Sequence, residues 1–442
     1  MAVVTQILNG QWVFGAAFVW DTGAVPADGD DVVLLENGNI IVDDDTNALN
    51  SITQTGDASR ISIPAVDKTL NCDGNASFSG WVTGPGTLAV SGSLTTGVEC
   101  LFENGLQLLL DGTGTVTNNA TALGGADTVI NTAGTITLAT DFPTIDFTRT
   151  LGAVVTDAVA IIASGNVLHS GGTGNPLITM TGDKTFTWAS NTDPPARLTV
   201  ADGATVTRTG ATSYVRSLVV EEGGELVGDS SIVISLNGDF APSSCAGAIT
   251  GGILYISPIT AHRSNTGDFT GLTCDVNING TTDAVNFTQN GRFETTGNLI
   301  VANANNDRWV GFVVNGLLRC GDVTLGGSGN RSGVLSLGSG SHHLASVIMG
   351  DDANTANGLL LGSSSVFLSG TADGNSPDTN PMTITANGAN LHGGTLLDAN
   401  VVGPLHAWGV TIAGATTKDV LHEGSNAGAA LGGLHSMIGV AA

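Results

Sequence analysis

The residues of this chain with the clearest capacity for chemistry are its carboxylates, since Asp and Glu number 39 against 13 Lys and Arg. Two carboxylates can flank a glycosidic bond, and several together can hold Ca²⁺. The sequence offers six such groups: Asp43, Asp44 and Asp45; Asp141 with Asp146; Glu221 with Glu222; Glu294 with Asp307 and Arg308; Asp28, Asp30 and Asp31 around Gly29; and Asp351 with Asp352. Turns favour Asp for backbone reasons alone, so we expect each group to be structural.

Histidine and the known catalytic motifs give no stronger signal. His342 and His343 are adjacent, so in a strand they face opposite sides and cannot chelate one ion together. His422-Glu423-Gly424 does not continue as H-E-x-x-H. No G-x-S-x-G stands on a strand-to-helix turn, and no Lys follows a phosphate-binding glycine loop. The sequence therefore predicts no catalytic residue, no metal site and no cofactor.

Tryptophan is the remaining candidate for binding, because saccharide sites usually combine an aromatic platform with polar partners. The chain has six Trp and two Tyr. Trp81, Trp188 and Trp309 could line a sugar groove, although a position in the core or at a corner is the commoner role. Trp12, Trp20 and Trp408 lie near the chain ends, where they suit a cap or a contact with another chain.

Composition excludes several classes of protein. Charged residues make up 12%, against about 25% in typical soluble domains, while a hydrophobic fraction of 41% is too high for a disordered chain. A net charge of −26 repels phosphate backbones, so we expect no nucleic-acid partner. Five isolated Cys without a C-x-x-C pair predict small buried side chains in a reduced protein.

Targeting signals are not recognisable either. No apolar stretch of about 18 residues occurs, so no membrane span is expected. No Lys or Arg precedes Arg60, whereas a secretory signal needs a basic region before its apolar core. We therefore expect the protein to be made and used without Sec export.

The strands that would position these side chains are first recognisable between Trp20 and Ile52. Val32–Leu35 and Ile40–Val42 are rich in β-branched residues and read as strands. Asn37-Gly38 between them predicts a tight turn with positive φ. The same alternation of a few β-formers with a Gly, Asn or Asp turn continues downstream.

An internal repeat follows. The segment Leu198-Thr-Val200-Ala-Asp-Gly203 aligns with Leu218-Val-Val220-Glu-Glu-Gly223 at an offset of 20, and Ile178-Thr-Met180 fits one step earlier. Gly114-Thr-Val116 and Gly134-Thr-Ile136 share that offset, and Leu337 and Leu361 stand 24 apart. A period of 20 to 24 residues matches one coil of a parallel β-helix, so we predict an all-β solenoid. A β-sandwich or jelly roll is the alternative.

Three segments are expected along the chain. Residues 1–52 read as an N-terminal cap or contact segment, with the covering strand in residues 1–19. Residues 53–402 read as the solenoid, with an irregular break at 241–275 where the repeat phase is lost. Residues 403–442, richer in His, Gly and Ala, read as a C-terminal cap or contact segment.

The pattern W-x-x-G-x-x-P-x-x-G-D, at Trp20, Gly23, Pro26, Gly29 and Asp30, resembles the opening of many β-helix proteins of phage virions and bacterial surfaces. The later L-x-V-x-x-G units look like pectate-lyase-like and autotransporter-like solenoids. This resemblance covers most of the chain and is carried mainly by composition and period. It implies the fold more than an activity, although pectate lyases and phage tailspike glycosidases share that fold.

The expected function is that of a non-catalytic structural virion protein, a decoration or cement protein on the exterior of a phage capsid, assembled in the host cytoplasm. Its expected partners are the major capsid protein or other virion proteins, and resemblance to phage fibres implies a homotrimer. The alternatives are a tail fibre or tailspike that recognises host polysaccharide and, third, a bacterial surface adhesin.

Overall fold

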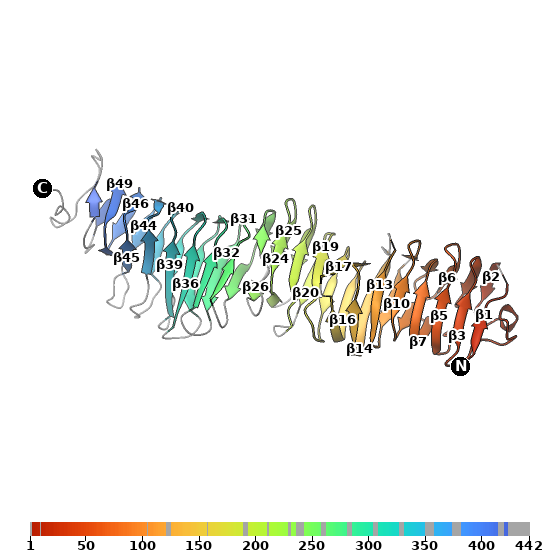
Figure 1. The fold of residues 1–442 in the computed structure, drawn as a ribbon. Helices are drawn as coiled ribbons and strands as arrows, with labels where there is room; N and C mark the ends of the chain where they lie inside the picture. The colour runs from red at the N-terminus through yellow and green to blue at the C-terminus, as the bar shows by residue number, and fades with distance from the viewer. Residues whose placement is uncertain are drawn as a thin grey trace. The chain divides into compact units, whose positions relative to one another are not determined.

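The computed structural model shows a β-solenoid built of parallel strands (Figure 1). It describes residues 2–8, 10–103, 105–120, 125–156, 158–188, 193–209, 212–228, 231–235, 243–257, 262–280, 285–303, 308–326, 331–349, 358–373, 382–413 and 420–422. The chain divides into two compact units, residues 1–213 and 214–442. The predicted fold class is confirmed, and each unit is described by itself.

Unit 1 contains four stacks of strands paired in parallel, each joining one coil to the next. The first consists of β1 (Val3–Thr5), β3 (Asp31–Leu34), β5 (Leu49–Gln54), β7 (Thr69–Phe78), β10 (Leu94–Thr96), β13 (Gly114–Asn118), β14 (Ala126–Leu138) and β16 (Phe147–Val155). The second starts from the other half of β7 and adds β9 (Thr87–Val90), β12 (Leu106–Leu110), β14, β16, β18 (Val167–His169), β20 (Lys184–Trp188) and β22 (Thr205–Arg208).

The other two stacks of unit 1 are shorter. One consists of β2 (Gly10–Val13), β4 (Gly38–Ile41), β6 (Arg60–Ser62), β8 (Trp81–Thr83) and β11 (Leu101–Glu103). The other consists of β15 (Phe142–Thr144), β17 (Ala160–Ala163), β19 (Leu177–Met180) and β21 (Arg197–Val200). The point where the two units divide lies in β23 (Thr212–Val215).

Unit 2 repeats the design with three long stacks. The first is β24 (Leu218–Val220), β27 (Ser244–Cys245), β31 (Phe269–Leu272), β34 (Phe293–Thr295), β37 (Leu318–Cys320), β40 (Ser341–Leu344), β43 (Ser365–Leu368), β46 (Ala389–His392), β49 (Leu405–Trp408) and β51 (Val420–His422). Two short strands, β25 (Glu225–Gly228) and β28 (Ala248–Thr250), run beside its beginning.

The second stack of unit 2 is β26 (Ser231–Ser235), β29 (Ile253–Ser257), β32 (Asp275–Gly280), β35 (Leu299–Asn303), β38 (Val323–Leu325), β41 (Val347–Met349), β44 (Thr371–Asp373), β47 (Thr395–Leu397) and β50 (Thr411–Ala413). The third is β30 (Arg263–Asn265), β33 (Val285–Gln289), β36 (Arg308–Val314), β39 (Arg331–Leu337), β42 (Gly358–Gly362), β45 (Thr383–Ala386) and β48 (Asn400–Val402).

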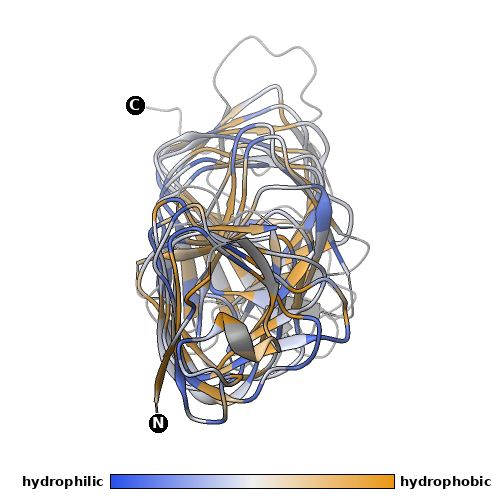
Figure 2. Ribbon diagram, turned by 90° about the vertical axis from the view of Figure 1, so that its right-hand side faces the viewer, coloured by the Kyte–Doolittle hydropathy of each residue, from blue (hydrophilic) through white to orange (hydrophobic). Residues whose placement is uncertain are grey.

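The core consists of inward side chains that meet their equivalents on the neighbouring coil. Burial alternates along the strands, as in Leu106, Leu108 and Leu110 of β12, which are buried while the residues between them are not. In Figure 2, hydrophobic residues (orange) and hydrophilic residues (blue) both occur along the coils. Like side chains meet on neighbouring coils, as do the tilted rings of Phe269 and Phe293, whose centroids lie 5.5 Å apart. The rings of Phe287 and Phe312 stack at 5.8 Å. Each coil thus buries the core face of the next.

The register tests the repeat read from the sequence. Ile178 pairs with Leu198 and Met180 with Val200, which confirms the offset of 20 at that step. Leu335 pairs with Leu359, which confirms the offset of 24. Gly203 and Gly223, aligned as turn glycines, have φ of +73° and +84°, a region that favours glycine.

One offset was wrong by two residues. Gly114 pairs with Ile136, so the offset there is 22 rather than the 20 that would align it with Gly134. An even shift keeps the same side chains inward, which is why the apolar pattern did not expose the error.

The stretch from Trp20 to Ile52 forms the strands that its composition predicts, β3 and β4. The turn differs from the expectation, because Gly38 does not have a positive φ. Glycine is needed there for space, since a Cβ at this position would clash with the side chain of Gln6. β3 and β4 belong to different stacks, so the turn is a coil corner rather than a hairpin.

The free edge of β1 is covered by the segment that follows the one 3₁₀ helix of the described residues, Ala17–Val19. Asp21 donates its N–H to the carbonyl of Thr5 and accepts the N–H of Thr5 on its carboxylate, at 2.9 and 3.0 Å. Trp20 is buried and donates its indole N–H to the carbonyl of Phe14 at 3.0 Å. This arrangement satisfies backbone groups that would otherwise be open at a sheet edge.

Parallel pairing extends into both predicted terminal segments. It starts at Val3, which pairs with Asp31, and it reaches β51 at the other end, where Leu405 pairs with Val420. In the region 241–275, the strands β27 to β31 keep parallel partners. Residues 414–419 and 423–442 of the predicted C-terminal segment lie outside the described residues.

Candidate functional site

The carboxylates and amides of unit 1 form a column that links one coil to the next. Asp127 accepts the backbone N–H of Asp146 at 3.3 Å, and Asp146 accepts that of Asn166 at 2.6 Å. Asn166 in turn accepts the N–H of Thr185 at 3.1 Å. We call these four residues the cap column. Each oxygen satisfies a backbone donor of the next coil, which is the structural role expected for Asp and Asn.

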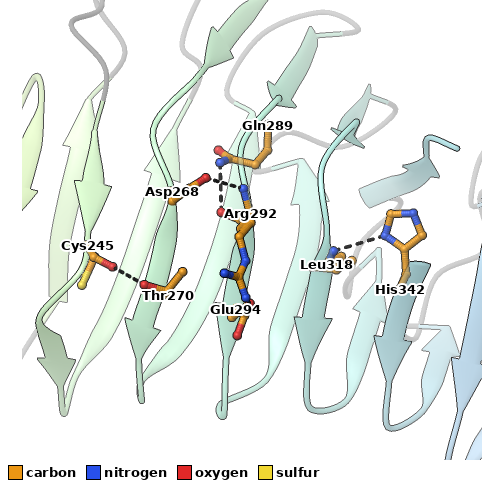
Figure 3. A network of polar contacts seen from close by, with 8 residues as sticks. All are labelled: Cys245, Asp268, Thr270, Gln289, Arg292, Glu294, Leu318 and His342. Carbon is orange, nitrogen blue, oxygen red and sulfur yellow. Dashed lines mark hydrogen bonds and ion pairs between the residues drawn. The ribbon is translucent and has the colours of Figure 1, made fainter. Parts of the chain in front are cut away.

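Unit 2 uses the same device. Asp275 accepts the N–H of Asn298 at 2.8 Å, and Asn298 accepts that of Asp322 at 3.2 Å. Figure 3 shows a related bond on the neighbouring stack, where Asp268 accepts the N–H of Arg292 at 2.7 Å. The carboxylates are therefore acceptors for successive coils in both units.

Buried amides continue this pattern inside unit 2. Asn265 donates to the side-chain oxygen of Gln289 at 3.0 Å, and Gln289 donates to the carbonyl of Arg292 at 3.2 Å (Figure 3). Both side chains are almost fully buried. Their bonds satisfy polar groups that would be costly to leave unpaired in the interior.

The candidate group Asp43, Asp44 and Asp45 is exposed, and Asp44 and Asp45 contact different partners. Asp44 forms an ion pair with Lys68 at 2.9 Å, and the hydrogen bond from Lys68 lowers the pKa of the Asp44 carboxyl. Asp45 accepts the N–H of Thr69 at 2.8 Å. These contacts attach a turn to the coil beside it.

Asp141 and Asp146 likewise accept hydrogen bonds from different residues. Asp141 accepts the N–H of Ala160 at 2.8 Å, while Asp146 belongs to the cap column. Glu221 and Glu222 are exposed. Glu294 forms an ion pair with Arg292 (Figure 3), whereas Asp307 and the side chain of Arg308 lie outside the described residues.

The acidic turn at Asp28, Asp30 and Asp31 has three separate sets of partners. Asp28 accepts the N–H of Ala48 at 2.9 Å, and Asp30 accepts those of Ala2 and Ala27 at 2.9 and 3.0 Å. Asp31 accepts from the side chains of Asn50 and Ser51, both at 2.6 Å. The backbone bonds from Ala27 and Ala2 lower the pKa of Asp30, and the bonds from Ser51 and Asn50 lower that of Asp31.

Histidine follows the prediction where the structure tests it. His342 is buried and His343 is exposed, so the two rings do face opposite sides of β40. His342 accepts the N–H of Leu318 at 3.2 Å (Figure 3), and burial lowers its pKa. Asp351, Asp352, Glu423, Gly424 and the side chain of His422 lie outside the described residues.

The described part of the chain contains no group of three or more His, Cys, Asp or Glu arranged to hold a metal ion. All five cysteines are free and buried, as the sequence predicted. Burial raises the pKa of each thiol, for example that of Cys100 to about 12.

The tryptophans differ in exposure to solvent. Trp20 and Trp188 are 1% exposed and belong to the core, so neither offers a surface to a ligand or another chain. Trp81 and Trp309 are partly exposed and each lines an open hollow, while Trp408 is partly exposed at the end of a ring stack described below. The side chain of Trp12 lies outside the description.

The Trp81 hollow lies on the outer face of the β2-β4-β6-β8-β11 stack. Its volume is about 390 Å³, and it is lined by Asn39, Ile40, Ile41, Asp57, Ala58, Ser59, Arg60, Ser62 and Trp81. The guanidinium carbon of Arg60 lies 4.5 Å from the centre of the Trp81 ring. Asn39, Arg60 and Trp81 are register partners on consecutive coils, so the repeat itself assembles this wall.

The Trp309 hollow lies on the outer face of the β30-to-β48 stack of unit 2. Its volume is about 350 Å³, and it is lined by Asn286, Trp309, Gly311, Val313, Val334, Ser336 and Leu360. A Cβ on Gly311 would clash with Oδ1 of Asn286 and would lie 3.1 Å from the Trp309 ring, so this glycine leaves room for both side chains. The lining has no charged side chain, in contrast to the Trp81 hollow.

Two clusters escaped the sequence reading. The inner cluster consists of Arg149, His169 and Trp188 in the core of unit 1. Arg149 donates through Nε to Nδ1 of His169 at 3.1 Å, and the His169 and Trp188 rings stack at 4.1 Å. The Arg149 guanidinium also donates to the carbonyl of Thr173 at 2.6 Å.

Desolvation lowers the pKa values of two members of the inner cluster. It lowers the pKa of Arg149 to about 10. Desolvation first, and then the Arg149 charge, lowers the pKa of His169 to about 4. His169 is therefore neutral near pH 7, whereas Arg149 is charged.

The outer stack consists of His343, Phe367, His392 and Trp408, on the outer face of the first stack of unit 2. The three ring-to-ring distances are 4.8, 4.6 and 6.5 Å, with interplanar angles of 10° to 13°. The four residues are register partners on consecutive strands. The rings cover one another's faces, so the stack presents mainly ring edges to solvent.

Comparison of the chain with protein families, with curated proteins and with solved structures finds no match. Among the described residues, no helix has the length and apolar character needed to cross a membrane.

Proposed function

We propose that this chain is a structural virion protein of a bacteriophage, a decoration protein on the capsid exterior that is assembled in the host cytoplasm and works without catalysis. The observation that carries the proposal is the use of its carboxylates. The carboxylates of Asp127, Asp146 and Asp275 accept hydrogen bonds from backbone N–H groups of the next coil. This chemistry builds a scaffold rather than a reaction centre.

Mechanical resistance would be the contribution of such a scaffold. Among the described residues, parallel ladders join successive coils, and in places a side-chain acceptor such as Asp146 or a core ring pair such as Phe269 and Phe293 adds a further contact. The free edge of β1 is covered. Opening one coil therefore costs the contacts of both its neighbours, which favours slow unfolding and slow proteolysis.

Attachment to the particle, and the homotrimer implied by the fibre resemblance, are assigned to the terminal segments. Near the N-terminus, Val3 and Ile7 are 62% and 52% exposed, while Val4, Phe14 and Val19 are buried. The exposed pair is suited to a contact with the major capsid protein or a second copy, and the buried residues hold the cap. Changing Val3 and Ile7 to Ser should reduce the number of copies per particle without unfolding the coils, as measured by quantitative mass spectrometry of purified virions.

Immunogold electron microscopy of virus particles from a lysate of the source culture tests the location. Gold spread over the heads is the expected result. Gold confined to the tail tip would replace decoration with host recognition. Gold on no particle would overturn the virion assignment altogether and would turn attention to a bacterial surface protein.

A tail fibre or spike that recognises host polysaccharide is the second candidate function. The Trp81 and Trp309 hollows favour it, because each combines a partly exposed indole with polar groups at a site large enough for a sugar ring. In this case too the coils act as scaffold, and recognition takes place on their outer faces.

A further inference from the structure

We propose that the Trp81 hollow is a binding site for a carboxylate-bearing sugar, such as a hexuronate residue within an acidic polysaccharide. The inference concerns the purified chain itself. It holds whether the protein stands on a capsid, on a tail or on a cell, so it goes beyond the proposed function.

Arg60 is a cation that packs against Trp81 and has no ion-pair partner among the described residues. The chain has 13 Lys and Arg against 39 acids, so an available guanidinium is uncommon on its surface. Arg60 is exposed and stacks on the Trp81 ring at 4.5 Å. Within the described residues no carboxylate pairs with Arg60. The indole packs against the guanidinium, and the N–H groups of Arg60 remain free for a carboxylate.

Polar groups line the hollow around this cation. Asn39, Asp57 and Ser62 line the same hollow, and no side-chain hydrogen bond is found for them in the part of the chain described. An amide, a carboxylate and a hydroxyl together offer donors and acceptors for sugar hydroxyl groups. The half-buried side chain of Ile41 supplies an apolar surface beside them.

The two charges select among anions. Arg60 can form a bidentate pair with a carboxylate, whereas Asp57 in the same lining repels a second negative charge. A monovalent carboxylate attached to a polyhydroxylated ring satisfies both, because Asp57 then accepts hydroxyl protons. A phosphomonoester carries more negative charge, and a phosphodiester backbone offers fewer hydroxyl groups, so both fit the pair less well.

The Trp309 hollow supplies an internal contrast. It has an indole and a similar volume, about 350 Å³, but its lining holds no charged side chain. If an aromatic hollow alone were sufficient, uronate and neutral sugars would bind the chain equally well. A preference for uronate has to come from Arg60.

The test is isothermal titration of the full chain with oligogalacturonate, and with the same oligosaccharide after reduction of its carboxyl groups to alcohols. Oligoglucuronate and oligomannuronate widen the search among uronates. We expect at least one uronate to bind and its neutral counterpart to bind about tenfold or more weakly, since one charge-assisted pair is lost.

Three variants assign the site. Arg60→Gln should weaken uronate binding about tenfold or more and leave the neutral oligosaccharide unaffected. Arg60→Lys keeps the charge and loses the planar fork, so its loss should be smaller. Arg319→Gln, which changes an exposed arginine that lines neither hollow, is the matched control and should bind as the unchanged chain does. Circular dichroism and thermal unfolding verify the fold of each variant, and Trp81→Phe provides a milder change at the stacking partner.

Binding of none of the three uronates would overturn the proposal. So would equal affinity for the charged and reduced oligosaccharides, or full binding by Arg60→Gln. None of these outcomes would bear on the location of the protein, which immunogold labelling decides separately.

Discussion

The inner cluster of unit 1 and the outer stack of unit 2 are built by the same rule and differ in what surrounds them. Both place flat side chains in register on consecutive coils, Arg149-His169-Trp188 in one and His343-Phe367-His392-Trp408 in the other. The inner rings are at most 1% exposed, whereas Phe367 is 40% exposed. Stacking is thus a consequence of the repeat, and its energetic weight depends on which side of the strand the residues occupy.

The difference teaches that burial sets the chemistry of these groups. Inside, a charged guanidinium needs carbonyl partners, and His169 becomes hard to protonate. Outside, water solvates the ring edges, and stacking contributes only its packing energy. Three changes sharpen this comparison, from the largest expected effect to the smallest.

Replacement of Arg149 by Met should be the most damaging change. It removes the charge-assisted bonds to the carbonyl of Thr173 and to His169. The carbonyl keeps the N–H of Val154 as a donor, whereas Nδ1 of His169 is left buried without one. We expect a loss of about 3 kcal/mol or more in the free energy of unfolding. Unfolding in guanidinium chloride measures it. A loss no larger than that of Phe367→Ala would contradict the account.

As the pH falls, the inner cluster should be destabilised before the carboxylates with lowered pKa values become protonated. The folded pKa of His169 is about 4, below the usual value of 6.5, so between these values the unfolded state binds more protons. Stability is complete above about pH 6.5 and should fall by up to about 3 kcal/mol on the way to pH 4.

The control for this pH dependence is His169→Asn, which cannot be protonated. The pKa of His342 is also lowered by burial, so some dependence remains in the variant, and the readout is the difference between the two chains. Identical slopes from pH 6.5 to 4 would show that His169 does not resist protonation in the fold.

Replacement of Phe367 by Ala should have the smallest effect. The substitution removes the ring and its stacking contacts with His343 and His392, but this ring is partly exposed in the folded chain. We expect a loss of about 1 kcal/mol. Thermal unfolding at neutral pH can detect it. A loss comparable to that of Arg149→Met would mean that the outer stack is an essential part of the coil packing.

The sequence predicted the solenoid because its signals are local. Apolar residues recur every second position, glycines mark turns, and segments such as Ile178 and Leu198 align at the coil period. The opposite facing of His342 and His343 followed from the same alternation. The hydrogen bonds of Asp44, Asp45, Asp141 and Asp146 to neighbouring coils agree with the structural role expected from turn chemistry.

The outer stack could not be found in this way, because coil length varies. His343 and Phe367 are 24 residues apart, Phe367 and His392 are 25 apart, and His392 and Trp408 are 16 apart (367 − 343, 392 − 367 and 408 − 392). Turns of different length absorb the difference, so no fixed period brings these rings together. The Trp81 hollow likewise depends on the register that joins Arg60 to Trp81 across a coil.

The central claim is that the carboxylates of this chain serve as hydrogen-bond acceptors between coils, and Asp146 tests it most directly. Asp146→Asn keeps an oxygen for the N–H of Asn166, whereas Asp146→Ala removes it. We predict that Asn changes the free energy of unfolding by at most about 0.5 kcal/mol and that Ala costs about 1–2 kcal/mol. The exposed Asp43→Ala serves as the matched control and should cost almost nothing. An Asn variant as unstable as the Ala variant would show that the negative charge itself is required, and the structural account of the carboxylates would then be wrong.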